Sequence, residues 1–155
     1  PNLRNYYELE LKSSISMDIP LGYRVTSITP ELIKRGYNNS ELVENEMQSE
    51  RPNLDDFFEK SFAFCTIKDD TITSWCMSEY NVEGRFEIGI ETHPEYRKIG
   101  LAVQTAKACI NHGLEKGYKR VGWHCWKDNL ASNKTAMRIG FEFKLEYEIE
   151  YLELL

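Results

Sequence analysis

The sequence predicts a domain of the α+β or α/β class, which contains both strands and helices. Three stretches lead to this class. Residues 86–92 are β-branched and aromatic residues interrupted by glutamates, which is typical of a strand. Residues 101–116 place four apolar side chains at helical spacing, and Gly117 is suited to end that helix. Residues 141–151 alternate apolar side chains with Glu and Lys, which predicts a strand with one solvated face.

The other elements follow from turn and cap signals. Thr29 before Pro30 is typical of a helix start, as is Asn53, and Lys68-Asp69-Asp70 is typical of a hairpin turn. Further strands are expected at residues 5–12, 22–28, 62–67, 71–79 and 120–126. Further helices are expected at residues 31–36, 40–50, 53–61 and 129–139. These local patterns favour α+β or α/β without deciding the order of the strands.

Length and charge limit the classes of function. The chain has 155 residues, of which 41% are hydrophobic, and a net charge of −6. This length is typical of one domain with a sufficient core. A net-acidic chain has no general attraction to nucleic acid or to anionic lipid, and it mildly favours a cationic substrate. The expected partners are therefore a small molecule, no nucleic acid and no membrane; a homodimer is left open.

The cysteines indicate the compartment. Cys65, Cys76, Cys109 and Cys125 lie in runs that look buried, and none has C-x-x-C spacing. This pattern indicates reduced cysteines in a cytoplasmic protein, and neither a metal site nor a disulfide framework. The sequence shows no secretion signal and no apolar run of about 18 residues, so export and membrane insertion are not expected.

The turn before residue 101 is a candidate phosphate site. Pro94 ends the preceding strand, and Arg97 and Lys98 place two cations before the next helix. Successive N–H groups at a helix start can bind an anion. Gly100 has no side chain, so a phosphate can approach the backbone there. The alternative is an ordinary turn with surface cations.

Two motifs carry a resemblance to a known family. Thr92-His93-Pro94-Glu95-Tyr96-Arg97, with Gly100 and Ala102, resembles the acetyl-CoA-binding motif Q/R-x-x-G-x-G/A of the GCN5-related N-acetyltransferases (the GNAT superfamily). That motif often follows V-x-P, and Thr92 here replaces the Val. Asn129-x-x-Ser132-x-x-x-Ala136-x-x-x-Gly140-Phe141 resembles the family's Asn-x-x-Ala-x-x-x-Tyr-x-x-x-Gly-Phe segment.

The resemblance implies a fold and a cofactor. The GNAT-like acyl-CoA acyltransferase fold has a mostly antiparallel central sheet with helices on both faces. The cofactor would be acetyl-CoA, with no metal. Its pantetheine arm would pair with the backbone of Ile90 and Thr92, and Asn129 and Ser132 would contact the same region. Its phosphates would accept hydrogen bonds from the backbone N–H groups of Lys98, Ile99, Gly100, Leu101 and Ala102. Arg97 would lie nearby.

The resemblance also places the catalytic carboxylate. Family members often use a glutamate on the strand before the turn to take the proton of the amine. We favour Glu91, which lies nearest the point where this strand is expected to separate from its neighbour, and keep Glu87 as the second candidate. Phe86 occupies the family's own position, so either glutamate could instead be a solvated strand charge.

Three other positions affect the mechanism. His124 beside Cys125 would allow a Cys–His acyl-enzyme, but direct acetyl transfer needs no such step, and Cys125 is more typical of a core residue. His93 is more typical of a structural loop residue than of a proton relay. Ala136 occupies the position where many members carry the tyrosine that protonates the leaving thiolate, and alanine cannot donate a proton.

The function implied is transfer of an acetyl group from acetyl-CoA to a primary amine of a small molecule, in a ternary complex. A protein or peptide acetyltransferase and a non-catalytic acyl-CoA-binding regulatory domain are the alternatives; Ala136 favours the latter. We expect residues 1–20 to be an N-terminal extension or a linker from a preceding domain, and residues 21–155 to be the acetyltransferase domain. Such an extra part occurs in members related to antibiotic self-resistance acetyltransferases.

Overall fold

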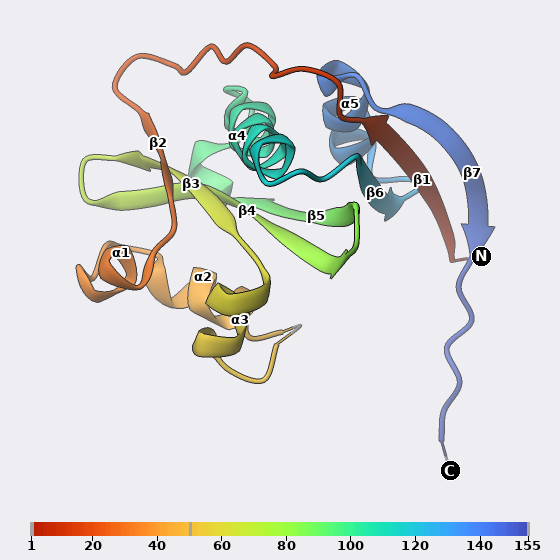
Figure 1. Cartoon of the computed structure of the whole chain (residues 1–155), viewed down its shortest axis with the longest axis horizontal. Helices are drawn as coiled ribbons and strands as arrows, with labels where there is room; N and C mark the ends of the chain where they lie inside the picture. Colours follow the sequence, from red (N-terminus) through yellow and green to blue (C-terminus); the bar gives the residue numbers. More distant parts are fainter. Residues whose placement is uncertain (1, 50, 155) are drawn as a thin grey trace.

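In the computed structural model, which describes residues 2–49 and 51–154, seven strands form one mixed sheet in the order β2-β3-β4-β5-β6-β1-β7 (Figure 1). The strands are β1 (Leu3–Glu10), β2 (Arg24–Ser27), β3 (Ala63–Lys68), β4 (Thr71–Val82), β5 (Arg85–Thr92), β6 (Arg120–Trp126) and β7 (Glu142–Glu148). Among the pairings described, β5 with β6 is parallel and all others are antiparallel. The mostly antiparallel sheet implied by the resemblance is therefore confirmed.

Helices cover both faces of this sheet, because each face has its own apolar cluster. The helices are α1 (Pro30–Lys34), α2 (Ser40–Met47), α3 (Leu54–Lys60), α4 (Leu101–Glu115) and α5 (Leu130–Ile139). On one face, Val43, Met47 and Phe57 of α2 and α3 pack with Trp75 and Met77 of β4. On the other face, α4 and α5 pack against Phe86, Val121 and Trp123, among others. Figure 1 shows the two layers, with α4 and α5 above the sheet and α1–α3 below it.

The N-terminal strand lies inside the sheet. β1 pairs with β6 on one side, where Tyr6 is opposite His124, and with β7 on the other, where Tyr6 is opposite Leu145. Residues 1–20 were expected from the sequence to be an extension or a linker. They contain β1, so the sheet is built from residues on both sides of the expected boundary. The division into domains stays a prediction.

Most elements lie where the sequence places them. The three helices expected between residues 31 and 61 are present but shorter, and Thr29 and Asn53 cap two of them: each side chain accepts a backbone N–H three residues on. The last strand ends at Glu148, before the expected residue 151, and residues 150–154 are exposed. No helix among the described residues is long and apolar enough to cross a membrane.

Candidate active site

A cleft opens where β5 and β6 separate. The two strands pair only from Arg85 opposite Arg120 to Glu87 opposite Gly122. Beyond Glu87, β5 continues to pair with β4 as far as Thr92, but not with β6. The resulting cavity measures about 610 Å³. A parallel pair that separates in this way leaves one edge of β5 without a strand partner.

The cleft passes through the sheet. It is lined on β5 by Glu87, Ile88, Gly89 and Ile90, and on β6 by Trp123, His124, Cys125 and Trp126. Successive residues of a strand point to opposite faces. A cavity lined by consecutive residues of both strands is therefore reached from both faces, and two ligands can meet in it from opposite sides.

The start of α4 can bind an anion. Gly100 is its N-cap, with φ of 84°, and no side chain caps the helix. The first N–H groups of α4 therefore have no side-chain acceptor among the described residues, and a helix N-terminus of this kind attracts negative charge. A Cβ built on Gly100 meets nothing within 4 Å, so the space in front of this backbone is open.

Arg97 and Glu91 face each other at the surface. The Arg97 guanidinium lies 3.1 Å from the Glu91 carboxylate, and its Nε donates to the Thr92 carbonyl at 3.1 Å. The two side chains are 55% and 46% exposed. Glu91 does not line the cleft. The two strongest sequence candidates for anion binding and for catalysis are thus paired with each other outside the cavity.

The remaining cofactor candidates lie around the cleft and the turn. Thr92 has a buried hydroxyl with no hydrogen-bond partner among the described residues, which a bound group could satisfy. Asn129 and Ser132 line the cleft from the start of α5. Asn129 also caps α5 by accepting from the Ser132 N–H at 3.2 Å, and the Ser132 hydroxyl accepts from Trp123 Nε1 at 3.0 Å. The residues present therefore fit a CoA thioester.

The other residues of the turn differ in exposure. Lys98 and Ile99 are exposed, and Lys98 has a left-handed backbone with φ of 69°. Leu101 is buried in the core at the first turn of α4, and Ala102 is partly buried beside it. In this turn, the backbone rather than the side chains is what an approaching anion would meet.

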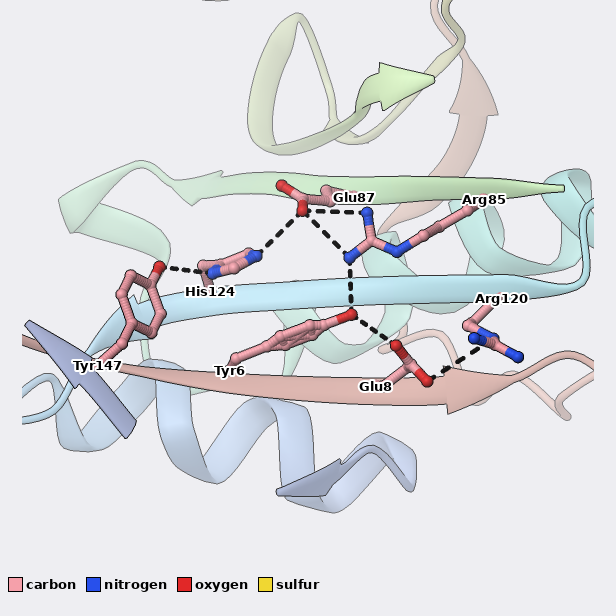
Figure 2. A network of polar contacts seen from close by, with 7 residues as sticks. All are labelled: Tyr6, Glu8, Arg85, Glu87, Arg120, His124 and Tyr147. Atoms are coloured by element: carbon pink, nitrogen blue, oxygen red, sulfur yellow. Dashed lines mark hydrogen bonds and ion pairs between the residues drawn. The ribbon is translucent and has the colours of Figure 1, made fainter. Parts of the chain in front are cut away.

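Glu87 lies at the point where the strands separate, and it belongs to a polar network on the face that α4 and α5 do not cover (Figure 2). Its Oε1 accepts from His124 Nε2 at 3.0 Å and from both terminal nitrogens of Arg85 at 3.2 Å. Burial acts to raise the pKa of the Glu87 carboxyl, but His124 and Arg85 together outweigh it, so this pKa lies below its ordinary value. Glu87 therefore stays ionised near neutral pH.

The ionised Glu87 sets the hydrogen position on His124. A carboxylate can only accept, so Nε2 of His124 carries the hydrogen, and Nδ1 of the neutral ring is left as an acceptor. The Tyr147 hydroxyl lies 2.6 Å from this Nδ1 and donates to it. Tyr147 reaches across from β7, and its side chain also lines the cleft. Burial raises the pKa of Tyr147, and the nearby Arg4 opposes this.

Two further carboxylates face the same cavity. Glu46 of α2 and Glu79 of β4 line it together with Glu87. Burial raises the pKa of Glu46, and a hydrogen bond from Trp75 Nε1, at 3.4 Å, opposes the shift. The Glu79 carboxylate lies directly over Gly89, where a Cβ would come within 2.1 Å of it. Three carboxylates therefore line the cavity, together with the guanidinium of Arg4.

The cysteine and the other histidines have structural surroundings. Cys125 is buried, and burial raises the pKa of its thiol, which makes it a poor nucleophile. His124 is its neighbour on β6, so the two side chains point to opposite faces. His93 caps the short turn Pro94–Tyr96, where its Nδ1 accepts from the Glu95 N–H at 3.3 Å. Ala136 is fully buried in the core and does not line the cleft.

Sequence reasoning missed four of these residues, namely Arg4, Glu46, Glu79 and Tyr147, and gave His124 no role. His124 was the one with a local signal, because it is a polar residue in an otherwise apolar strand. Arg4 and Tyr147 come from opposite ends of the chain, and their approach to β6 depends on the placement of β1 in the sheet.

Solved structures with this fold include GCN5-related N-acetyltransferases. A GCN5-related N-acetyltransferase-like protein from Streptococcus suis 89/1591 superimposes with a TM-score of 0.71 at 19% identity, over 94% of this chain and 61% of that one. AAC(6')-Iy, solved in complex with the bisubstrate analog CoA-S-monomethyl-acetylneamine, has a TM-score of 0.62 at 19% identity, over 86% of this chain and 99% of that one. The fold is therefore that of the GNAT superfamily.

The sequence comparisons identify the family itself. A family model described as GNAT acetyltransferase matches residues 2–150, and the chain belongs to this family. The "Uncharacterized N-acetyltransferase YdfB" of Bacillus subtilis (strain 168) is 29% identical over 137 residues, which is 88% of this chain and 51% of the relative. The chain thus spans about half the length of this curated relative.

Proposed function

We propose that the domain transfers an acetyl group from acetyl-CoA to a primary amine of a small molecule, by direct attack while both are bound. The observation that carries this proposal is the separation of β5 and β6 after Glu87, which opens a cavity through the sheet. The start of α4, which follows β5 in the chain, has no side-chain cap. Membership of the GNAT acetyltransferase family supports it.

The CoA thioester would enter from the side of α4 and α5. The N–H groups of residues 98–102 would hold its phosphates, with Arg97 adding charge. Its pantetheine arm would pair with the free edge of β5 at Ile90 and Thr92, and Asn129 and Ser132 would border it from α5. Bound acetyl-CoA supplies an acetyl group activated as a thioester.

The amine would enter from the opposite face. Glu46, Glu79 and Glu87 line the cavity there, so an acceptor that carries a positive charge fits its electrostatics. Of the two glutamates of β5, we place Glu87 in the active site, because it lies in the cavity, whereas Glu91 pairs with Arg97 outside it. Activity should rise with pH, because only a neutral amine can attack.

Calorimetry with CoA tests the cofactor site. Gly100→Val places a branched side chain where the phosphates would lie, and CoA binding should be lost. Gly22→Val is the matched control, since Gly22 also has a positive φ and open space around it, but lies in the loop before β2. Arg97→Ala should weaken binding more at low salt than at high salt, because exposed charges are screened. Unchanged affinity in Gly100→Val and Arg97→Ala would overturn the placement.

A non-catalytic acyl-CoA-binding domain is the second candidate. The observation that favours it is the burial of Ala136, where many members carry a catalytic tyrosine. Turnover of acetyl-CoA with a panel of primary amines separates the two candidates. Acetylated product supports the enzyme, and CoA binding without turnover on any amine supports the binding domain.

A further inference from the structure

Three side chains from three strands form an unbroken line of hydrogen bonds beside the cleft. Tyr147 of β7 donates to His124 Nδ1 at 2.6 Å, and His124 Nε2 donates to Glu87 Oε1 at 3.0 Å. Figure 2 shows Tyr147 at one end of this line and Glu87 at the other, with the His124 ring between them. All three residues line the cavity. The order carboxylate, imidazole, hydroxyl is the one that activates a hydroxyl group in other enzymes.

α5 brings no hydroxyl to this cavity at the position of Ala136, because that residue is buried in the core. Tyr147 brings a phenol to the cavity from β7 instead. Its hydroxyl already contacts a ring nitrogen that can take and return a proton. Tyr147 thus supplies from β7 the hydroxyl group that α5 lacks at Ala136.

We propose that Tyr147 is a catalytic residue that carries a proton from the attacking amine to the departing thiolate, with His124 holding the proton between the two transfers. This rests on the function proposed above. As the C–N bond forms, the Tyr147 oxygen takes a proton from nitrogen, and the Tyr147 proton passes to His124 Nδ1. As the C–S bond breaks, Tyr147 donates its proton to sulfur, and His124 returns its proton to the Tyr147 oxygen. Both residues end as they began, and one proton has moved from nitrogen to sulfur.

Acidity explains why three groups are needed. A thiol has an ordinary pKa of about 8.5 and a tyrosine of about 10, so a phenol alone is a weaker acid than the thiol it would form. Burial raises the pKa of Tyr147 further. A proton supplied from Nδ1 as the phenol gives up its own removes this obstacle, because no free phenolate is formed.

Glu87 positions the ring and does not store the proton. Its pKa lies below the ordinary value, so the carboxylate remains ionised beside the imidazole. The negative charge favours a positive ring and fixes the tautomer that leaves Nδ1 facing Tyr147. The same division of labour holds in the Ser-His-Asp triad, in which the carboxylate is not itself protonated.

Several charged and titratable groups face His124. Glu87 and Arg85 face it from β5, and Tyr147 from β7. The ring of Tyr6 on β1 lies 4.6 Å from it, between centroids, and the Tyr6 hydroxyl accepts from Arg85 at 2.6 Å. One carboxylate and one guanidinium are therefore closest, and they act in opposite directions on a positive ring.

The test compares Tyr147→Phe with Tyr118→Phe, using acetyl-CoA and any amine that the wild-type domain acetylates. Each variant removes one partly buried hydroxyl group. Tyr118 does not line the cleft, and its hydroxyl accepts a hydrogen bond from Asn81 Nδ2. Tyr147→Phe should lower kcat by about 10²-fold or more, the usual scale of general acid–base catalysis, with unchanged CoA affinity. Tyr118→Phe should keep wild-type kcat. A Tyr147→Phe enzyme within threefold of wild-type kcat would overturn the relay.

A second pair of variants tests the ring. His124→Gln should lose most of its turnover at unchanged CoA affinity, while His112→Gln, which alters a histidine on α4, should keep wild-type kcat. If Glu46→Gln abolishes turnover and both relay variants retain it, Glu46 is the proton acceptor and the relay is wrong. A wild-type domain that binds CoA but acetylates no amine overturns the proposed function, and the relay with it.

Discussion

The two halves of the sheet differ in what covers them. β3 and β4 have α1–α3 on one face and α4 on the other, and their side chains are mostly buried. In β6, β1 and β7, the face turned away from α5 carries the polar network of Figure 2. Figure 1 shows that the described helices below the sheet lie under the first half. The covered half thus provides stability, while the open half keeps charged groups within reach of water and substrate.

The strongest test of this comparison removes a strand from the open half. A shortened chain that begins at residue 21 lacks β1, which would leave β6 and β7 without the strand that joins them. We expect it to lose cooperative thermal unfolding, as followed by circular dichroism.

A chain that ends at Ile149 is the control, because the described residues that it loses, 150–154, are exposed, and it should melt within a few degrees of the full chain. Cooperative unfolding of the chain that begins at residue 21 would instead make β1 a dispensable addition, as the sequence suggested.

A smaller effect is expected from single truncations in the two halves. Phe86 is 0% exposed under α4, and Phe86→Ala should lower the free energy of unfolding by about 3–5 kcal/mol. Leu145 of β7 is 49% exposed, and Leu145→Ala should change the free energy of unfolding by less than about 0.5 kcal/mol. Urea unfolding measures both. Equal losses would show that the open half also carries a core.

The smallest expected effect concerns two carboxylates that face the same cavity. Glu87, beside Arg85, His124 and, across the strand pair, Glu79, has a lowered pKa. Its stabilising contribution is therefore present above the ordinary carboxyl pKa of about 4.3 and is lost as pH falls through the lowered value. Glu46 has a raised pKa, so its contribution is present at low pH and is lost as pH rises.

Glu87→Gln should therefore lower the melting temperature at pH 7 and leave it almost unchanged near pH 3. Glu46→Gln should raise the melting temperature more at pH 7 than at pH 4. Each substitution should change the free energy of unfolding by no more than about 1 kcal/mol, because both carboxylates are partly exposed to solvent. Parallel pH profiles of the two variants would contradict the opposite shifts.

Local patterns predicted the elements of the cofactor side. Pro94 and Gly100 mark a turn through their own backbone preferences, and Asn129 marks a helix start, so each signal lies in consecutive residues. The sequence could not rank Glu87 against Glu91. They have the same strand parity and point to the same face, and the difference arises where β6 separates and where Arg97 folds back on Glu91.

The relay was beyond local reasoning for the same physical cause. Tyr147 and His124 are brought together because β1 lies between their strands and sets the register of both. Nothing in the residues around either one indicates that a strand from the other end of the chain lies between them. The proton route therefore depends on a topology that was not predicted from the sequence.

The internal position of β1 also affects how the chain folds during its synthesis. Tyr6 is made well before its neighbours His124 and Leu145, which both lie more than 100 residues further along the chain. At about 5–20 residues per second, β1 would wait on the order of ten seconds without either neighbour. Contacts between distant parts of a chain also slow folding. A strand left unpaired for this time is a natural client for chaperones that hold nascent chains.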